Sequence, residues 1–264
     1  MLIDSHVNLH AHQYDEDRQA VIDRARKAGI ELMVTICDKI PSFETVHAIA
    51  MAECDIWCTV GAHPHEAKDH VSLTTERLIE LASRPKVIGI GETGLDFHYD
   101  LSPRDVQADV FRAHVAAARR TGLPLVVHTR EADAVMGDIL EAEHAKGPFK
   151  ILMHCYTSGA DLAKRMAALG AWFSVSGIAT FKQAQEVRDI IADMPADRII
   201  LETDCPYLAP VPMRGRRNEP AYLPHVLDKL AEIRGWTRAD AEARTEDAFF
   251  ALFDRIPRPA SVSA

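Results

Sequence analysis

The stretch KVIGIGETGLDF (86–97) shows the pattern that decides the fold: an apolar run that leads into a carboxylate, Glu92. Near-continuous apolar runs of this kind are typical of parallel strands that are covered on both faces. Seven more such runs lie on either side of it: MLIDSH (1–6), ELMVTICD (31–38), IWCTVGAH (56–63), PLVVHTRE (124–131), KILMHCYT (150–157), AWFSVSG (171–177) and RIILETDCP (198–206).

Segments with helical spacing separate these runs, for example 15–29 and 102–122, and glycines stand where several of the helices should end. Eight strand–helix units in one chain of 264 residues predict an α/β fold, a single (β/α)8 TIM barrel over residues 1–255. The alternative is a doubly wound open sheet. A further helix is expected over 237–253, followed by a loose tail over 256–264.

Composition narrows the possible functions. The formal net charge is −9, so the protein would not attract nucleic acid by its overall field, and a polyanionic substrate would need local cations or metal ions. The five cysteines have no CxxC spacing and predict reduced, mostly buried thiols. No run is long enough to span a membrane and no secretory signal is evident, so a cytoplasmic location is expected. Nothing in the helices indicates an obligate protein partner.

Polar residues end the apolar runs, and a barrel gathers such strand ends around one axis. One histidine on a strand is more often a packed residue than a ligand. Several imidazoles and carboxylates at equivalent positions would cost several kcal/mol each to bury without a counter-ion, so they predict a divalent metal site. The candidate ligands are His6, Asn8, Glu92, His128, His154 and Asp204. By contrast, His47, His70, His114 and His144 are expected to be surface residues.

The first of these strand ends lies in DSHVNLHAH (4–12). Because side chains alternate along a strand, His6 and Asn8 should face inward while Val7 and Leu9 pack outward. His10 would lie about 13 Å from His6 on a continuing strand, too far to share an ion, and is expected in the following loop.

Six motifs in this order cover nearly the whole chain: GAHPH (61–65), GETGLDFHYDLSPRDVQ (91–107), LPLVVHTREA (123–132), MHCYTSG (153–159), ETDCPYLAP (202–210) and RGRRNEPAYL (214–223). In them the chain resembles the TatD family of metal-dependent DNases, within the amidohydrolase-type barrels. The resemblance implies a binuclear metal site that hydrolyses DNA phosphodiesters. Glu92 would bridge two ions, His128 and His154 would hold one, and Asp204 would bind metal and handle the water. The family's N-terminal motif is His-x-His, and here Asn8 replaces the second histidine.

The expected activity is that of a deoxyribonuclease, a 3'–5' exonuclease on single strands or ends that uses metal-activated water, with Asp204 as general base and a role in DNA repair. The cofactors would be divalent Zn, Mn, Mg or Co ions. One would be firmly bound and one weaker, because the Asn8 amide is a poor ligand. Glu202 should face away from Asp204 and support the site. The alternatives are an amidohydrolase or esterase for a small molecule, and a metal-binding protein whose catalysis Asn8 has weakened.

A second set of residues is expected to bind the DNA or oligonucleotide substrate: His63, His65, Arg130, Tyr156, Arg214, Arg216 and Arg217. The arginines would contact phosphates and Tyr156 would stack on a base. The alternatives are an ion pair of Arg130 with Glu131 or Asp133, an ion pair of the arginine loop with Glu219, and a purely structural role for His63.

Overall fold

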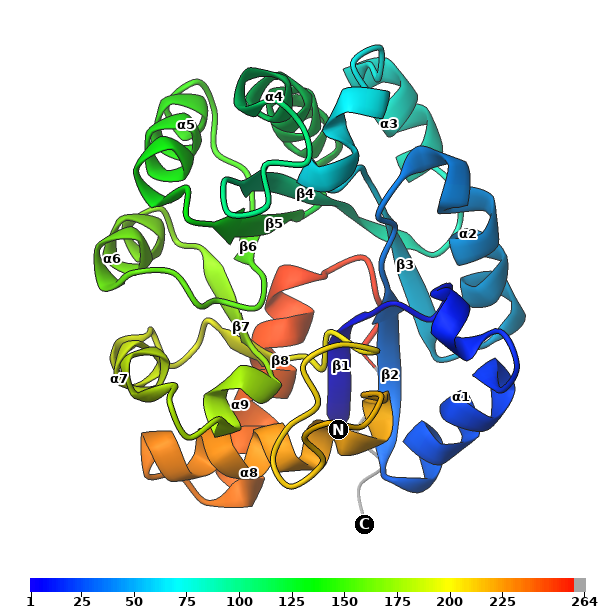
Figure 1. The fold of residues 1–264 in the computed structure, drawn as a ribbon, viewed down its shortest axis with the longest axis vertical. Coiled ribbons are helices and arrows are strands. Elements are labelled where there is room, and N and C mark those ends of the chain that lie inside the picture. The colour runs from blue at the N-terminus through cyan, green and yellow to red at the C-terminus, as the bar shows by residue number, and fades with distance from the viewer. Residues whose placement is uncertain (259–264) are drawn as a thin grey trace.

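The computed structural model describes residues 1–258, and eight parallel strands form its sheet in the order of the sequence. The order excludes a doubly wound sheet, and the predicted barrel is confirmed (Figure 1). The strands are β1 (Leu2–Val7), β2 (Ile30–Thr35), β3 (Ile56–Val60), β4 (Val87–Asp96), β5 (Leu125–Arg130), β6 (Ile151–Met153), β7 (Trp172–Val175) and β8 (Ile199–Leu201).

The barrel closes between β1 and the segment that follows β8. Val7 forms a parallel bridge with Cys205, and the backbone N–H of Asp204 donates to the carbonyl of His6 over 3.0 Å. Two of the predicted strand ends are therefore joined directly by the contacts that complete the ring.

Helices follow the strands in turn and form the outer layer (Figure 1). They are α1 (Arg18–Lys27), α2 (Phe43–Ala52), α3 (Thr75–Ala82), α4 (Arg104–Thr121), α5 (Asp133–Ala145), α6 (Ala160–Ala168), α7 (Gln185–Asp193), α8 (Leu223–Arg234) and α9 (Arg238–Leu252). Gly122 ends α4 in a left-handed conformation that a residue with a Cβ adopts only at a cost, as the sequence predicts. No helix within residues 1–258 is both long and apolar enough to cross a membrane.

The amino-terminal end of the barrel is closed by α9. Phe249 and Phe253 pack against residues near the starts of the strands, among them Ile3, Ile88 and Ile200. Ile256, the first residue of the predicted loose tail, belongs to the same cluster and is buried, because it continues the apolar face of α9. The rest of that tail, from 259 onward, lies outside the described residues. The opposite end, where the strands finish, is left for polar residues.

Three histidines predicted on the surface, His47, His70 and His114, are buried, and His144 is half-buried. The helical pattern did not reveal that ring nitrogens of the three buried histidines bond to backbone groups. Nε2 of His114 accepts from Ala62 N over 3.0 Å while Nδ1 lies 2.7 Å from the Val110 carbonyl. Burial costs little when both nitrogens are bonded in this way. The cysteines are free as predicted: Cys37, Cys58 and Cys205 are buried, Cys155 is partly buried and Cys54 is exposed.

Replacing Phe253 with Ala should lower the free energy of unfolding by about 3–5 kcal/mol, because it empties a fully buried site beneath the barrel. Urea denaturation measures the change. The matched control is Leu101→Ala, which removes an exposed apolar side chain and should stay within about 0.5 kcal/mol of the parent. Equal stabilities of the two variants would show that α9 does not hold the barrel closed.

Candidate metal centre

Glu92 is turned into the barrel mouth by an irregularity of β4. The pairing of β4 with β5 shifts register between Ile90 and Thr93. The glycines on either side of Glu92, Gly91 and Gly94, have φ angles of 134° and 146°, which only glycine adopts without strain. A Cβ on Gly91 would lie 2.6 Å from the carbonyl oxygen of Val126 on β5. The glycines of GETG thus allow the close approach that points the carboxylate inward.

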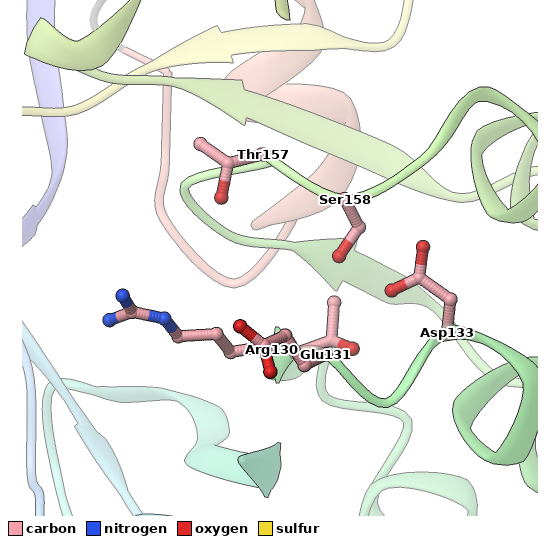
Figure 2. Close-up of a pocket in the computed structure, with 6 residues that line it drawn as sticks. Arg130, Glu131, Asp133, Thr157 and Ser158 are labelled. Atoms are coloured by element: carbon pink, nitrogen blue, oxygen red, sulfur yellow. The ribbon is translucent and has the colours of Figure 1, made fainter. Parts of the chain in front are cut away.

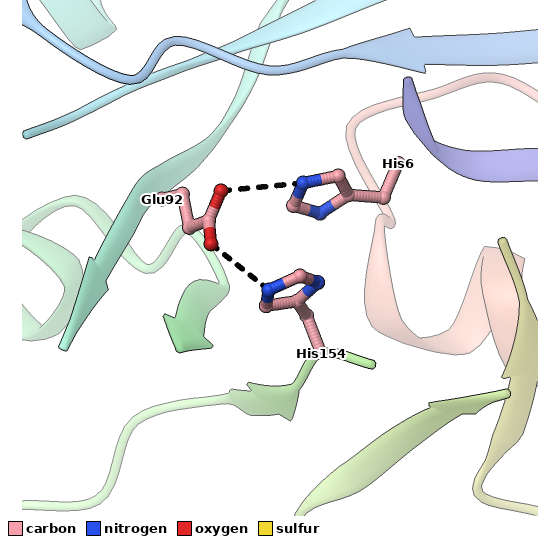
Figure 3. A group of neighbouring side chains, drawn as sticks. All are labelled: His6, Glu92 and His154. Atoms are coloured by element: carbon pink, nitrogen blue, oxygen red, sulfur yellow. Dashed lines mark ion pairs between the residues drawn. The ribbon is translucent and has the colours of Figure 1, made fainter. Parts of the chain in front are cut away.

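Four imidazoles from four parts of the barrel face this one carboxylate. On Oε1, Nε2 of His154 lies at 2.9 Å, Nδ1 of His128 at 3.2 Å and Nε2 of His63 at 3.4 Å. On Oε2, Nε2 of His6 lies at 3.3 Å. Figure 3 shows His6 and His154 directed at the two oxygens of Glu92. The carboxylate is therefore the common neighbour of all four rings.

The rings divide into two groups able to hold a metal ion, and Glu92 belongs to both. One group is His6, Glu92 and His154; the other is His63, Glu92 and His128, with the ligand atoms of each group within 4.8 Å of one another. The sequence analysis assigned His128 and His154 to one ion, which stays a prediction: the two rings fall in different groups, but both face Oε1 of Glu92. The structure also adds His63, which we expected only at the substrate. His63 follows the run 56–62, the same strand-end position as the other candidates, so the signal was present.

The electrostatics of the cluster are compatible with a bound cation. Burial alone would raise the pKa of Glu92, but His154, His63 and His6 outweigh it and hold that pKa well below its usual range. Burial lowers the pKa of His63 to about 4, so this ring is neutral and free to act as a ligand. Both ring nitrogens of the fully buried His6 lack a hydrogen-bond partner in the part of the chain that the structure describes. Unpaired nitrogens around a buried carboxylate fit a bound divalent ion.

Asp204 lies beside this cluster and belongs to neither group of three. Its Oδ1 is 3.6 Å from Nε2 of His6, and its backbone adopts a φ of 54°, which non-glycine residues seldom do. Burial raises the pKa of Asp204 to about 6. The carboxylate is thus held at the edge of the centre in a form that can exchange a proton near neutral pH.

The side chain of Asn8 is directed at Asp204. Its Nδ2 donates to Oδ1 of Asp204 over 3.3 Å and to the carbonyl of Cys205 over 3.1 Å. The expected role of Asn8, an oxygen ligand of the metal, has no support in this arrangement, because the amide presents its N–H group to the site. Val7 and Leu9 pack outward as predicted, and His10 lies in the following loop, where Nε2 is 3.0 Å from Oδ1 of Asp38.

Glu202 supports the centre from behind. It is fully buried, its Oε1 lies 3.3 Å from Nδ1 of His154, and Ser174 Oγ donates to its other oxygen. Bonding the far nitrogen of a ligating histidine fixes its ring orientation and raises its basicity. This agrees with the supporting role predicted for Glu202.

Asp96 has the equivalent place behind His128, and our sequence analysis missed it. Its Oδ2 lies 3.2 Å from Nε2 of His128 and 3.0 Å from Nε2 of His65, while Oδ1 accepts from the backbone N–H groups of His98 and Tyr99. His65, predicted at the substrate, is therefore bonded to this carboxylate. The available signal was the even spacing of Asp96 from Glu92 on the same strand.

The predicted substrate residues differ in whether their side chains are exposed and available to a ligand. Arg130 is exposed, stacks over the ring of Tyr99 at 4.8 Å and forms no ion pair with any of residues 1–258, so the expected alternative pairing with Glu131 or Asp133 is wrong. Tyr156 is buried and its hydroxyl donates to the carbonyl of Gly159, so it offers no face for a base. Its strand-end position did not show that the ring turns back into the core.

The three arginines of the loop after β8, Arg214, Arg216 and Arg217, also differ in whether a carboxylate compensates their charge. Arg217 is paired with Asp17 at 2.7 Å, and Glu219 pairs with Arg24, not with the loop arginines as the alternative had it. Arg214 stacks over Phe181 at 3.9 Å. Within the described chain, neither Arg214 nor Arg216 has a carboxylate partner. Two of the three arginines thus keep an uncompensated charge.

Because Glu92 belongs to both groups, its removal should weaken both metal sites, whereas each histidine should matter to one. We expect Glu92→Ala to lose binding at both sites, His6→Ala to weaken one site, and His63→Ala to weaken the other, each by at least about tenfold. Calorimetric titration of metal-stripped protein with zinc measures this. The matched control is His225→Ala, on α8 and in neither group. Two undisturbed sites in Glu92→Ala would contradict a shared carboxylate.

Comparison with known proteins identifies the family. The family model described as TatD related DNase matches residues 3–254. A metal-dependent hydrolase of Bacillus subtilis, YabD, is 37% identical over 94% of this chain and 97% of its own length. The 3'-5' ssDNA/RNA exonuclease TatD of Pantoea vagans is 37% identical over 92% and 98%. The crystal structure of YJJV, a TatD homolog from Escherichia coli, superposes with a TM-score of 0.89 at 25% identity, covering 97% and 98% of the two chains. The chain belongs to the TatD-related family of metal-dependent hydrolases.

Proposed function

We propose that this protein is a metal-dependent 3'–5' exonuclease that hydrolyses phosphodiester bonds at single-stranded ends of DNA or RNA. The observation that carries the proposal is the carboxylate of Glu92 shared by two pairs of imidazoles at the barrel mouth. The direction and the choice of nucleic acid rest on relatives named as 3'-5' ssDNA/RNA exonucleases.

Two divalent ions at these groups would grip a phosphate and lower the pKa of a bound water. Imidazole donors with one carboxylate suit zinc, manganese or cobalt better than magnesium, which prefers oxygen ligands. The two groups have the same donors, two imidazoles and the shared carboxylate. We therefore propose two sites of similar strength in place of the weak site expected from Asn8.

Asp204 is the residue we assign to proton transfer. Its pKa of about 6 leaves most of the carboxylate ionised at neutral pH, ready to accept the proton of the attacking water. The water oxygen forms a bond to phosphorus, the bond from phosphorus to O3' of the preceding nucleotide breaks, and O3' takes up the proton that Asp204 accepted. The products are a nucleoside 5'-monophosphate and a strand shortened by one residue. Asn8 holds Asp204 in place through its N–H group.

Arg130, Arg214 and Arg216 are the cations that we assign to the phosphates. A chain of net charge −9 repels a polyanion overall, so uncompensated local charges have to receive it. No observation favours a small-molecule amide or ester as substrate. A binding protein with weakened catalysis is disfavoured because Asp204 and both histidine pairs are present. A cytoplasmic role in DNA repair stays a prediction of the sequence.

Replacing Asp204 with Asn should leave folding and metal content intact and lower kcat by about 10²–10⁴-fold, because the amide cannot accept the proton. The measurement is turnover of a 5'-labelled single-stranded oligonucleotide with zinc or manganese, alongside metal analysis of each sample. Asp197→Asn, at an exposed aspartate, is the control and should keep full activity. If the Asp204 variant turned over near the normal rate, the base would have to be another group.

Replacing Arg214 and Arg216 together with Ala should raise KM for the oligonucleotide and reduce the slope of log KM against log salt by about 1, while kcat changes little. Arg217→Ala should move the slope far less, because Asp17 already compensates this charge. The assay compares KM over a series of salt concentrations. An identical slope in the double variant and the parent would show that Arg214 and Arg216 do not contact the phosphates and are solvated loop residues.

A further inference from the structure

A cavity of about 510 Å³ opens at the barrel mouth, and Arg130 is the only residue of its lining that the proposed function has used so far. It lies between the loop after β5 and the loop after β6 (Figure 2). Its lining is Thr129, Arg130, Glu131, Asp133, Thr157 and Ser158. The residue before Thr129 is His128, and His154 stands three residues before Thr157, so both walls begin at histidines of the metal groups.

The cavity has two chemically different ends. The guanidinium of Arg130 extends at one end, while the carboxylate of Asp133 lies at the other, beside the hydroxyl of Ser158 (Figure 2). Oδ2 of Asp133 accepts from Gly159 N over 2.8 Å and so ties the two loops together. Its other oxygen has no partner among residues 1–258. The lining carries no large apolar side chain, and its size is within the usual range of small-molecule sites.

Glu131 adds a second negative charge on the same wall. Its backbone has a φ of 53°, and its side chain reaches His98, with Oε1 2.7 Å from Nδ1. The cavity therefore presents the cation of Arg130 at one end and the carboxylate of Asp133 at the other, with the carboxylate of Glu131 between them (Figure 2). A ligand that carries a phosphate at one end and neutral hydroxyl donors at the other matches this order of charges, whereas a ligand with a phosphate at both ends is repelled.

We propose that this cavity holds the terminal nucleoside of the strand, with its 5'-phosphate beside Arg130 and its free 3'-hydroxyl donating to the carboxylate of Asp133, with Glu131 as a second negative charge on the same wall. The assignment rests on the exonuclease activity proposed above and gives it a physical basis: a strand that continued beyond the cavity would bring its next phosphate against two carboxylates. The cavity thereby selects 3'-hydroxyl ends over 3'-phosphorylated ends and over internal positions.

The test uses the metal-loaded protein and two 5'-labelled single-stranded oligonucleotides that differ only at the end, 3'-hydroxyl or 3'-phosphate. We expect kcat/KM to be at least about 10-fold higher for the 3'-hydroxyl end, because the added phosphate meets two like charges. In the double variant Glu131→Gln, Asp133→Asn this ratio should fall below about 3, through faster cleavage of the phosphorylated end. The double control Glu186→Gln, Asp189→Asn removes two exposed carboxylates from α7 and should keep the original ratio.

Binding provides a second readout that does not depend on turnover. Thymidine 5'-monophosphate should bind at least about 10-fold more tightly than thymidine 3',5'-bisphosphate in calorimetry, and the double variant should bind the two alike. If Asp133→Asn fails to fold, Glu131→Gln can be tested alone, because the Glu131 side chain is exposed and its replacement should not disturb folding. This single variant should halve the preference for the 3'-hydroxyl end.

Equal cleavage of the two oligonucleotides by the parent protein, together with equal binding of the two nucleotides, would overturn the cavity assignment and leave the exonuclease intact. A lack of cleavage of both oligonucleotides by metal-loaded protein would instead contradict the proposed function, and the binding ratio would then decide the cavity by itself.

Discussion

A buried carboxylate that faces four imidazoles is the constraint around which the barrel mouth is arranged. An ionised Glu92 without compensation would cost several kcal/mol at this depth, so the rings beside it stabilise the folded protein by compensating its charge. Burial lowers the pKa of His154, but Glu92 and Glu202 outweigh this effect and raise it well above its usual range. A divalent ion would replace such a proton, which makes folding, metal binding and proton release one linked equilibrium.

The strained backbone of the site and the apolar contacts that stabilise the fold lie at opposite ends of the barrel. Three non-glycine residues, Glu131, Cys155 and Asp204, take left-handed conformations at or just after the ends of β5, β6 and β8. Each such residue stores about 1–3 kcal/mol of strain. The apolar contacts that offset it lie at the other end, where α9 packs beneath the strands. Loops at the mouth can therefore be strained and polar without opening the core.

Much of this was accessible from the sequence. The eight apolar runs predicted the barrel, and the rule that strand ends converge brought together His6, Glu92, His128 and His154. The alternation of side chains along a strand could not predict the local backbone geometry at the strand ends. The register shift in β4 decides which rings meet Glu92, and it brought His63 into a metal group. Tyr156, expected at the mouth, is buried instead and its ring packs against Phe173, a long-range contact that the local sequence does not specify.

The arginines would allow an acidic protein to receive the polyanion proposed as its substrate. Arg217 is compensated by Asp17, whereas Arg130 and Arg214 lie on the rings of Tyr99 and Phe181, contacts that hold a guanidinium without neutralising it. An arginine held in this way loses little side-chain entropy when a phosphate arrives, and its charge is still available. The net charge of −9 would disfavour contact of nucleic acid with the rest of the surface. The uncompensated charges of Arg130 and Arg214 would then favour the approach of the proposed substrate to the barrel mouth, which is where the shared carboxylate and its imidazoles lie.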